Sequence, residues 1–289
     1  MIEVRVPATS ANLCVGFDSL GLAVDWWAKF YFEPSDSLTI TGCPKEYANK
    51  ENLVVLSFLE TCRHIGKELP AFHLHIESDI PFSRGLGSSS TCVVAGILAC
   101  DAWFGQGLNK MEMLEIATKI EGHPDNVAPC IFGNAVCSFM EQGHPRMMVI
   151  PCADYKGLVI IPDYPIQTQE ARKVLPDMLP FQSAVNQVGR ALCFVQALQT
   201  GNEMILAKAC DDVLHEPYRK KLIKDYEAIH QKCKELKLAM WISGSGSTMM
   251  AVSLDPEKLK ELQRFVETSL RLACKEVMIS KKGAWVNHE

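Results

Sequence analysis

The most informative stretch of this chain is Pro81-Phe82-Ser83-Arg84-Gly85-Leu86-Gly87-Ser88-Ser89-Ser90-Thr91. In it, a glycine loop leads into a long apolar segment that ends near Phe104. Glycine lets the backbone approach a ligand closely, since it has no side chain. The first turn of a helix adds N–H groups without partners and a partial positive charge. The stretch therefore predicts a site for phosphate at the start of a buried helix over residues 88–104.

This glycine loop matches neither of the two commonest nucleotide-binding patterns. A Walker A loop has a lysine directly after its last glycine, and a dinucleotide-binding loop has a third glycine at a fixed spacing. Here Ser88 follows Gly87 and no third glycine is in place. Positive charge for phosphate must therefore come from elsewhere. A simple turn before a serine-capped helix gives the same short pattern, so other motifs must decide.

Three further motifs stand in the chain. The first is Pro7-Ala8-Thr9-Ser10-Ala11-Asn12-Leu13, which runs on to Gly16-Phe17-Asp18-Ser19-Leu20-Gly21. The second is Glu121-Gly122-His123-Pro124-Asp125-Asn126-Val127-Ala128-Pro129, after a predicted helix. The third is a glycine-serine turn near the C-terminus, Ser243-Gly244-Ser245-Gly246-Ser247, between two predicted strands.

Together with the glycine loop, and in this order, these motifs resemble those of the GHMP kinases, a family of ATP-dependent small-molecule kinases. The sequences of residues 7–21 and 121–129 are similar to those of the family members that phosphorylate homoserine. Three departures are small or lie in loops. Cys14 and Val15 stand where the family usually has Gly-Pro, and Ser90 and Ser247 stand where it often has alanine and proline.

Hydrophobic periodicity along the rest of the chain mixes strands and helices. This mixture favours an α+β fold over a doubly wound parallel sheet. Helices are expected over residues 52–65, 88–104, 109–122, 182–200, 203–214, 225–236 and 256–273, and strands over residues 4–6, 26–33, 38–41, 72–76, 130–139, 147–150, 158–162, 239–242, 249–252 and 276–280. The resemblance implies the two-domain GHMP kinase fold, with a ribosomal protein S5 domain 2-like N-terminal part and a ferredoxin-like C-terminal part. We expect an ATP-binding N-terminal domain over residues 1–153 and a C-terminal domain over residues 154–289.

Composition excludes several other classes of protein. The net charge of −5 provides no basic surface for a nucleic acid. No apolar run reaches the ~20 residues of a membrane helix, and the N-terminus does not read as a signal peptide. The 12 cysteines include no C-x-x-C pair and read as free thiols, which favours a reducing compartment. We therefore expect a cytoplasmic enzyme with neither a nucleic-acid nor a membrane partner.

The resemblance assigns the phosphates of ATP to the glycine loop. The residues expected to contact the nucleotide are Pro81, Arg84, Gly85, Leu86, Gly87, Ser88, Ser89 and Ser90. It also implies that magnesium (Mg²⁺) is bound by a serine of this loop and a glutamate of the next helix. We assign Ser89 and Glu115, because the family's glutamate lies about two helical turns before the histidine of residues 121–129. Glu112 and Glu121 are the alternatives, and Glu112 is readily explained as a helix cap.

The substrate implied by the resemblance is the small molecule L-homoserine, an amino acid with a side-chain hydroxyl. Its ammonium group requires an acidic or amide partner, for which Asn12 and Asp18 are the candidates. Its carboxylate requires arginine, whose planar fork can bond both oxygens. Arg172 and Arg219 match the arginines of the family's homoserine site.

The catalytic residues implied by the resemblance are Asp125, Asn126 and Arg219, with His123 binding substrate in the same cleft. In related kinases the aspartate at this place acts as a catalytic base. A loose transition state for phosphoryl transfer requires little deprotonation beforehand. Asp125 is therefore expected either to accept the proton or to orient the hydroxyl.

Two other functions remain as alternatives. A GHMP kinase that acts on mevalonate or a related alcohol would also use arginine for a carboxylate, although Asn12 and Asp18 suit an ammonium group better. An inactive member that senses a nucleotide or sugar should have lost a loop glycine, and this chain keeps Gly85 and Gly87. The expected activity is therefore ATP-dependent phosphorylation of L-homoserine to O-phospho-L-homoserine, in threonine biosynthesis. The oligomeric state stays open, with a homodimer as one alternative.

Overall fold

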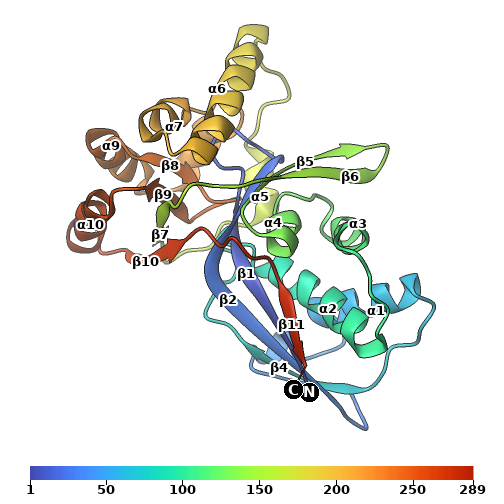
Figure 1. Cartoon of the computed structure of the whole chain (residues 1–289). Helices are drawn as coiled ribbons and strands as arrows, with labels where there is room; N and C mark the ends of the chain where they lie inside the picture. The colour runs from blue at the N-terminus through green and yellow to red at the C-terminus, as the bar shows by residue number, and fades with distance from the viewer. Residues whose placement is uncertain (289) are drawn as a thin grey trace.

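The computed structural model describes residues 1–288, which form two β-sheets with helices packed on them (Figure 1). Within these residues the larger sheet has seven strands, with β11-β1-β2-β4-β3 as its main path and β5 and β6 joined to β2. The seven are β1 (Ile2–Ala11), β2 (Leu20–Pro34), β3 (Thr39–Thr41), β4 (Phe72–Glu77), β5 (Ala135–Glu141), β6 (His144–Ile150) and β11 (Trp285–His288). The α+β class predicted from the sequence is confirmed.

Alternation of apolar and polar residues explains the strands of this sheet. In β2, Trp26, Phe30 and Phe32 point into the core, as expected where successive side chains face opposite sides. In β4, Phe72 and Leu74 are buried. The same inward faces meet the helices that cover the sheet.

Four helices cover one face of the larger sheet: α1 (Leu53–His64), α2 (Ser88–Phe104), α3 (Lys110–Glu121) and α4 (Val127–Phe132). Helix α2 lies among the others and against β1, which explains why apolar residues surround it on all sides. Its bounds are those predicted from the sequence. The glycine loop enters this helix at its N-terminus, so the fold presents that end of α2 to a ligand.

The smaller sheet consists of β7 (Lys156–Ile161), β8 (Ala239–Ile242), β9 (Met249–Ser253) and β10 (Ala273–Met278), all antiparallel. Their order is β10-β7-β9-β8. Numbered within the sheet this is 4-1-3-2, the order of a ferredoxin-like βαββαβ unit, as predicted. The helices of this half are α5 (Thr168–Lys173), α6 (Phe181–Thr200), α7 (Glu203–Ala209), α8 (Glu216–Arg219), α9 (Tyr226–Leu236) and α10 (Pro256–Phe265).

The domain boundary predicted between residues 153 and 154 stays a prediction. One strand from the second half of the chain belongs to the larger sheet, which the first half forms. Strand β11 returns to the larger sheet and pairs antiparallel with β1, for example Glu3 with Asn287. In Figure 1 this red strand lies beside the blue first strand, although the two are far apart in the sequence. The largest hydrophobic core also contains side chains of both halves, among them Phe194 and Trp241. No helix within residues 1–288 is long and apolar enough to cross a membrane.

Candidate active site

A cavity of about 580 Å³ is lined by residues of all four motifs. The motif residues in its wall are Asn12, Asp18, Phe82, Ser83, Arg84, Gly85, Leu86, Gly87, Ser88, Ser89, Ser90, Thr91, Glu121, His123, Asp125, Asn126, Gly244 and Ser245. Arg172 and Arg219 join them from the second half of the chain. The fold therefore brings together segments that are more than 200 residues apart in sequence.

The glycine loop leaves no room for side chains at its two glycines. Gly85 and Gly87 have φ angles of +75° and +65°, in the left-handed region that favours glycine. A Cβ atom on Gly85 would lie 2.0 Å from the backbone oxygen of Ser243, and one on Gly87 would lie 2.0 Å from Oγ1 of Thr9. The glycines therefore let the loop contact both residues 7–21 and the glycine-serine turn.

Hydrogen bonds hold these motifs against one another. The Ser243 hydroxyl donates to the Gly85 carbonyl at 2.6 Å, and the Thr9 amide donates to the Leu86 carbonyl at 3.1 Å. Arg84 donates from its guanidinium to the carbonyl of Asp163 at 2.8 Å. The start of α2 is thereby fixed from both halves of the chain.

Glu121, and not Glu115, is the acid beside the glycine loop. The Ser89 hydroxyl donates to Oε1 of Glu121, the last residue of α3. Glu115 lies outside the cavity, where its Oε1 is 3.3 Å from Nδ1 of His144. The two glutamates are six residues apart, which is about 9 Å along a helix. Only Gly122 separates the end of α3 from His123, so the helix end itself reaches the loop. Glu121 therefore fits the site better than Glu115, whose role in metal binding stays a prediction.

Ser89 and Glu121 fit a magnesium ion by their chemistry. Both present oxygen atoms, and Mg²⁺ is commonly bound by one or two carboxylates together with waters and substrate phosphates. Within residues 1–288 there is no cluster of three or more His, Cys, Asp or Glu that could hold a metal alone. Phosphate oxygens would complete the coordination. Glu112, by contrast, accepts a hydrogen bond from the Asn109 amide and caps α3.

His123, Asp125 and Asn126 form the floor of the cavity beside the glycine loop. Asp125 is buried, and its Oδ1 is 2.5 Å from Nδ1 of His123. This hydrogen bond raises the pKa of His123 above its ordinary value. Oδ1 of Asn126 accepts a hydrogen bond from the Thr9 hydroxyl at 2.8 Å, which ties this floor to the first motif.

Asn12 and Asp18 also lie in the cavity wall and are linked to each other. The Asp18 amide donates to Oδ1 of Asn12 at 3.0 Å, and Nδ2 of Asn12 donates to the Gly244 carbonyl at 2.8 Å. The φ angles of Asn12 and Asp18 are +72° and +51°, and asparagine and aspartate tolerate this region better than most residues. Asp18 also binds Arg172 through both carboxylate oxygens, each at 2.9 Å.

Arg219 lies buried next to this pair. It donates to the carbonyls of Ala171 and Gly244, each at 3.0 Å, and its guanidinium lies 5.0 Å from the ring centre of Phe17. Burial, and then the nearby Arg172, lower the pKa of Arg219 to about 10, so it remains charged at neutral pH. Arg172 pairs with Asp18, whereas the bonds of Arg219 go to backbone carbonyls, so its charge is available to an anionic group of a substrate.

Two residues predicted from the sequence do not line the cavity: Pro81 and Glu115. Phe82, next to Pro81, lies in the wall instead, and its ring centre is 6.0 Å from that of Tyr47. Other lining residues that the sequence did not reveal are Phe30, Cys43, Asn52, Leu53, Ile76, Ser78, Cys92, Ile166, Gln167 and Thr168. They belong to no motif, so only the position of Phe82 inside the glycine loop gave a signal for this part.

Glu216 is a buried acid close to the cavity, although it does not line it. Its Oε1 accepts from the Ile242 amide at 2.7 Å, and its Oε2 accepts from the Tyr226 hydroxyl at 3.1 Å. Burial, together with the charge of Asp212, outweighs these bonds and raises the pKa of Glu216 to about 7. A large part of this side chain therefore carries a proton near neutral pH.

We expect Glu216→Gln to stabilise the protein more at pH 8 than at pH 5. A carboxyl whose pKa is raised in the folded state contributes stability below its unfolded pKa of about 4.3, and this stability is lost as the pH rises through about 7. The whole shift corresponds to about 3 kcal/mol, at about 1.36 kcal/mol per pKa unit. Melting temperatures of both proteins at the two pH values test this. An equal difference at both values would contradict it.

Comparison with known proteins gives consistent relatives. The family model of the GHMP kinases N terminal domain matches residues 52–134, and that of the GHMP kinases C terminal domain matches residues 194–271. A homoserine kinase of Clostridium botulinum (strain Okra / Type B1) is 38% identical over 294 residues, covering 100% of this chain and 99% of the relative. One of Clostridium beijerinckii is 40% identical over 256 residues, covering 87% and 86%.

Two solved structures share the fold. A homoserine kinase from Cytophaga hutchinsonii has a TM-score of 0.88 and 27% identity, with 99% of this chain and 97% of that chain covered. A Streptococcus pneumoniae phosphomevalonate kinase has a TM-score of 0.72 at 14% identity, covering 96% and 99%, and this likeness concerns the fold alone.

Proposed function

This chain belongs to the GHMP kinase family, and on that basis we propose that it transfers the γ-phosphoryl group of ATP to the side-chain hydroxyl of L-homoserine, forming O-phospho-L-homoserine and ADP. The relatives with this activity in their names match the whole chain. Such a reaction is a step of threonine biosynthesis. Free cysteines suit the reducing cytoplasm, which we propose as its location.

One observation carries the choice of substrate: one carboxylate and two guanidinium groups meet at one end of the cavity. Asp18 can bind an ammonium group, while Arg172 and Arg219 can bind a carboxylate. An amino acid brings both charges at a fixed separation. Mevalonate has no ammonium group and would leave Asp18 without a new partner.

The glycine loop suits the phosphates of ATP. Amide groups at the start of α2 and the helix dipole favour negative charge there, and Arg84 adds a guanidinium in the wall. Ser89 and Glu121 are the residues that would hold Mg²⁺. When bound, this ion neutralises charge that develops on the phosphate oxygens.

Asp125 is proposed to guide the proton of the substrate hydroxyl. One of its carboxylate oxygens bonds to His123, which fixes the side chain in the cavity floor. The other can accept the hydroxyl hydrogen and so point the oxygen at the γ-phosphorus. Proton transfer can occur late, because the transition state is loose. Asn126, held by Thr9, keeps the floor in place next to Gly87.

A coupled ADP-release assay against homoserine, mevalonate, galactose and serine tests this function. We expect turnover with homoserine and little with the other three. Turnover of mevalonate without turnover of homoserine would exclude the proposal. Homoserine with its amino group removed should also react poorly, because it offers no partner for Asp18.

We expect Arg172→Leu to raise the KM for homoserine by about 10- to 100-fold. A charge-assisted hydrogen bond contributes about 1.5–3 kcal/mol, and about 1.4 kcal/mol corresponds to a factor of ten. The KM for ATP should hardly change, because ATP is proposed to bind at the glycine loop, whereas Arg172 bonds to Asp18. Lys173→Leu, at the exposed next position of α5, is the control. Equal KM values in both variants would show that Arg172 does not bind substrate.

A further inference from the structure

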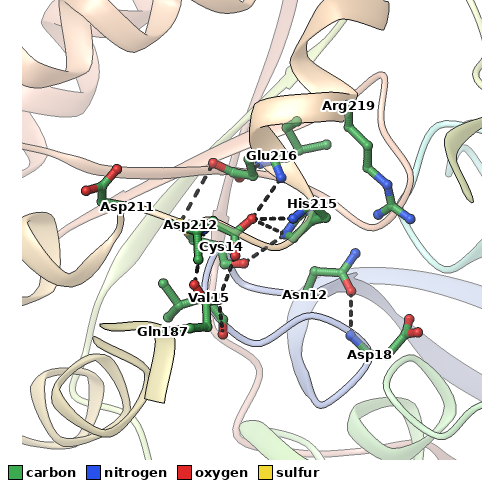
Figure 2. Close-up of polar contacts among 12 residues, drawn as sticks. Asn12, Cys14, Val15, Asp18, Gln187, Asp211, Asp212, His215, Glu216 and Arg219 are labelled. Atoms are coloured by element: carbon green, nitrogen blue, oxygen red, sulfur yellow. Dashed lines mark hydrogen bonds and ion pairs between the residues drawn. The ribbon is translucent and has the colours of Figure 1, made fainter. Parts of the chain in front are cut away.

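Two buried side chains from the second half of the chain donate hydrogen bonds to residues 12–18, here called the substrate loop (Figure 2). His215 donates from Nε2 to the carbonyl of Cys14 at 2.8 Å. Gln187 donates from its amide to the carbonyl of Val15 at 2.8 Å. His215 is fully buried and Gln187 is 6% exposed. Neither side chain lines the cavity, so neither is placed to touch a ligand.

The backbone of the substrate loop needs such support. Asn12, Leu13 and Cys14 have successive φ angles of +72°, +38° and +61°. Residues other than glycine avoid this region because the Cβ atom comes too close to the backbone, and asparagine and aspartate are the milder cases. Leucine and cysteine in this region require outside contacts to hold them. The hydrogen bonds at Cys14 and Val15 lie directly at and after these residues.

Asp212 fixes the two supporting side chains. Its Oδ1 accepts from the Gln187 amide at 2.6 Å, and its Oδ2 accepts from the His215 backbone amide at 2.7 Å. The side-chain oxygen Oε1 of Gln187 in turn accepts a hydrogen bond from the Val213 amide at 3.1 Å. Figure 2 shows Asp212, Gln187 and His215 as one connected set to the left of Asn12 and Asp18. These bonds set the direction of the Gln187 amide before any substrate binds, and they fix the backbone of His215.

The same set reaches the arginines of the site. The ring of Phe17, in the substrate loop, stacks on His215 with centres 5.2 Å apart. The guanidinium groups of Arg219 and Arg172 lie 5.0 and 5.7 Å from that ring centre. Arg219 follows His215 by four residues, at the other end of the short helix α8. One turn of helix thus supports the loop with one residue and faces the substrate with another.

We propose that His215 and Gln187 are positioning residues, which hold the substrate loop by its carbonyls so that Asp18 and Asn12 keep a fixed separation from Arg219. This inference rests on the proposed function, because the affinity it concerns is that for an amino-acid substrate. The separation between an acid and an arginine decides whether both charges of one small zwitterion can be bound at once. ATP should still bind when this loop is loose, because the glycine loop is held separately by Ser243 and Thr9.

The protonation of His215 agrees with this role. Burial lowers its pKa to about 4, so the ring is neutral at neutral pH and carries one hydrogen. That hydrogen must be on Nε2, since Nε2 faces a carbonyl. Nδ1 has no hydrogen-bond partner within the described residues. The ring is thus placed for one bond alone, the one to the substrate loop.

Variants of His215 separate the hydrogen bond from the ring. His215→Gln keeps an amide donor at about the same reach, whereas His215→Phe keeps a ring against Phe17 without a donor. We expect His215→Phe to raise the KM for homoserine about tenfold or more, with the KM for ATP unchanged, and His215→Gln to recover most of this loss. Gln187→Met should resemble His215→Phe. If the phenylalanine variant does not fold, His215→Asn replaces it, because its shorter amide cannot reach Cys14.

Amide hydrogen exchange of residues 12–20, measured without substrate, directly reports how often the substrate loop opens. We expect faster exchange there in His215→Phe and Gln187→Met, and near wild-type exchange in His215→Gln. Tyr155→Phe is the matched control, since it removes a buried donor to the Ala197 carbonyl away from the site. It should lower the melting temperature and change neither KM nor loop exchange.

The proposal is overturned if His215→Phe and Gln187→Met behave like Tyr155→Phe, with lower melting temperatures but unchanged homoserine KM and unchanged loop exchange. Absence of homoserine turnover in the unmodified protein is a different result, because it removes the proposed function. The exchange measurement then still decides whether these two residues hold the loop.

Discussion

Glu121→Gln should lower kcat by about 100-fold or more and leave the melting temperature almost unchanged. Within residues 1–288, Glu121 is the one carboxylate that bonds to the glycine loop, through Ser89. Glutamine keeps an oxygen that can accept from this hydroxyl, so the fold should persist. It lacks the charge that would hold Mg²⁺ against the phosphates, so stabilisation of the transition state should be lost. Steady-state kinetics over a range of magnesium concentrations measures this, and the variant should require more magnesium.

Glu115→Gln is the matched control, since Glu115 lies in the same helix but is exposed and faces His144. Its kcat should stay within about twofold of the wild-type value, as for surface substitutions away from special features. The reverse result, with Glu115→Gln impaired and Glu121→Gln active, would return the metal site to the residue chosen from spacing. Two active variants would remove the metal-binding role from helix α3.

Gly85→Ala should both destabilise the protein and abolish ATP binding. The added Cβ would lie 2.0 Å from the Ser243 oxygen and 3.1 Å from the Gly246 nitrogen. Both are backbone atoms of the glycine-serine turn and cannot move aside as a flexible side chain can. Overpacking costs about 1–3 kcal/mol, and the left-handed φ of +75° adds about 1–2 kcal/mol. Calorimetric titration with ATP and thermal unfolding measure the two effects.

Gly107→Ala separates crowding from backbone conformation. Its φ is +72°, close to that of Gly85, but a Cβ there would have nothing within 4 Å. This variant should lose only the cost of the φ angle, about 1–2 kcal/mol, and bind ATP normally. If Gly85→Ala lost no more stability than Gly107→Ala and still bound ATP, the close approach of the two loops would not matter for the site.

Local patterns predicted the elements with strong signals. Helix α2 has the bounds expected from its apolar run, and α3 has the expected cap at Asn109. The strand expected over residues 130–139 was partly wrong, since Val127–Phe132 forms helix α4 and β5 begins at Ala135. A short apolar run has no period that distinguishes a buried helix from a strand. The helix expected over residues 256–273 consists of α10 and a π-helical turn over Val266–Leu270, and the strand after it begins at Ala273.

The sequence predicted the polar end of the cavity better than the rest. Asn12, Asp18, Arg172 and Arg219 were selected by resemblance and meet in one wall, although their roles remain predictions. Glu115 was chosen from spacing, but the length of the loop after α3 decides which helical turn reaches Ser89. Tyr47 and Phe82 come together only through the tertiary fold, and nothing in the sequence near Tyr47 indicates its partner.

The pairing of β11 with β1 has a consequence for how the chain is made. While the ribosome synthesises the protein, the outer edge of β1 at residues 2–5 lacks its partner until residue 285 has emerged. At about 5–20 residues per second this delay lasts roughly 15–60 s. An unpaired strand edge can pair with other chains and lead to aggregation. A fragment of residues 1–153 would keep that edge open permanently, so we expect it to aggregate when it is expressed alone.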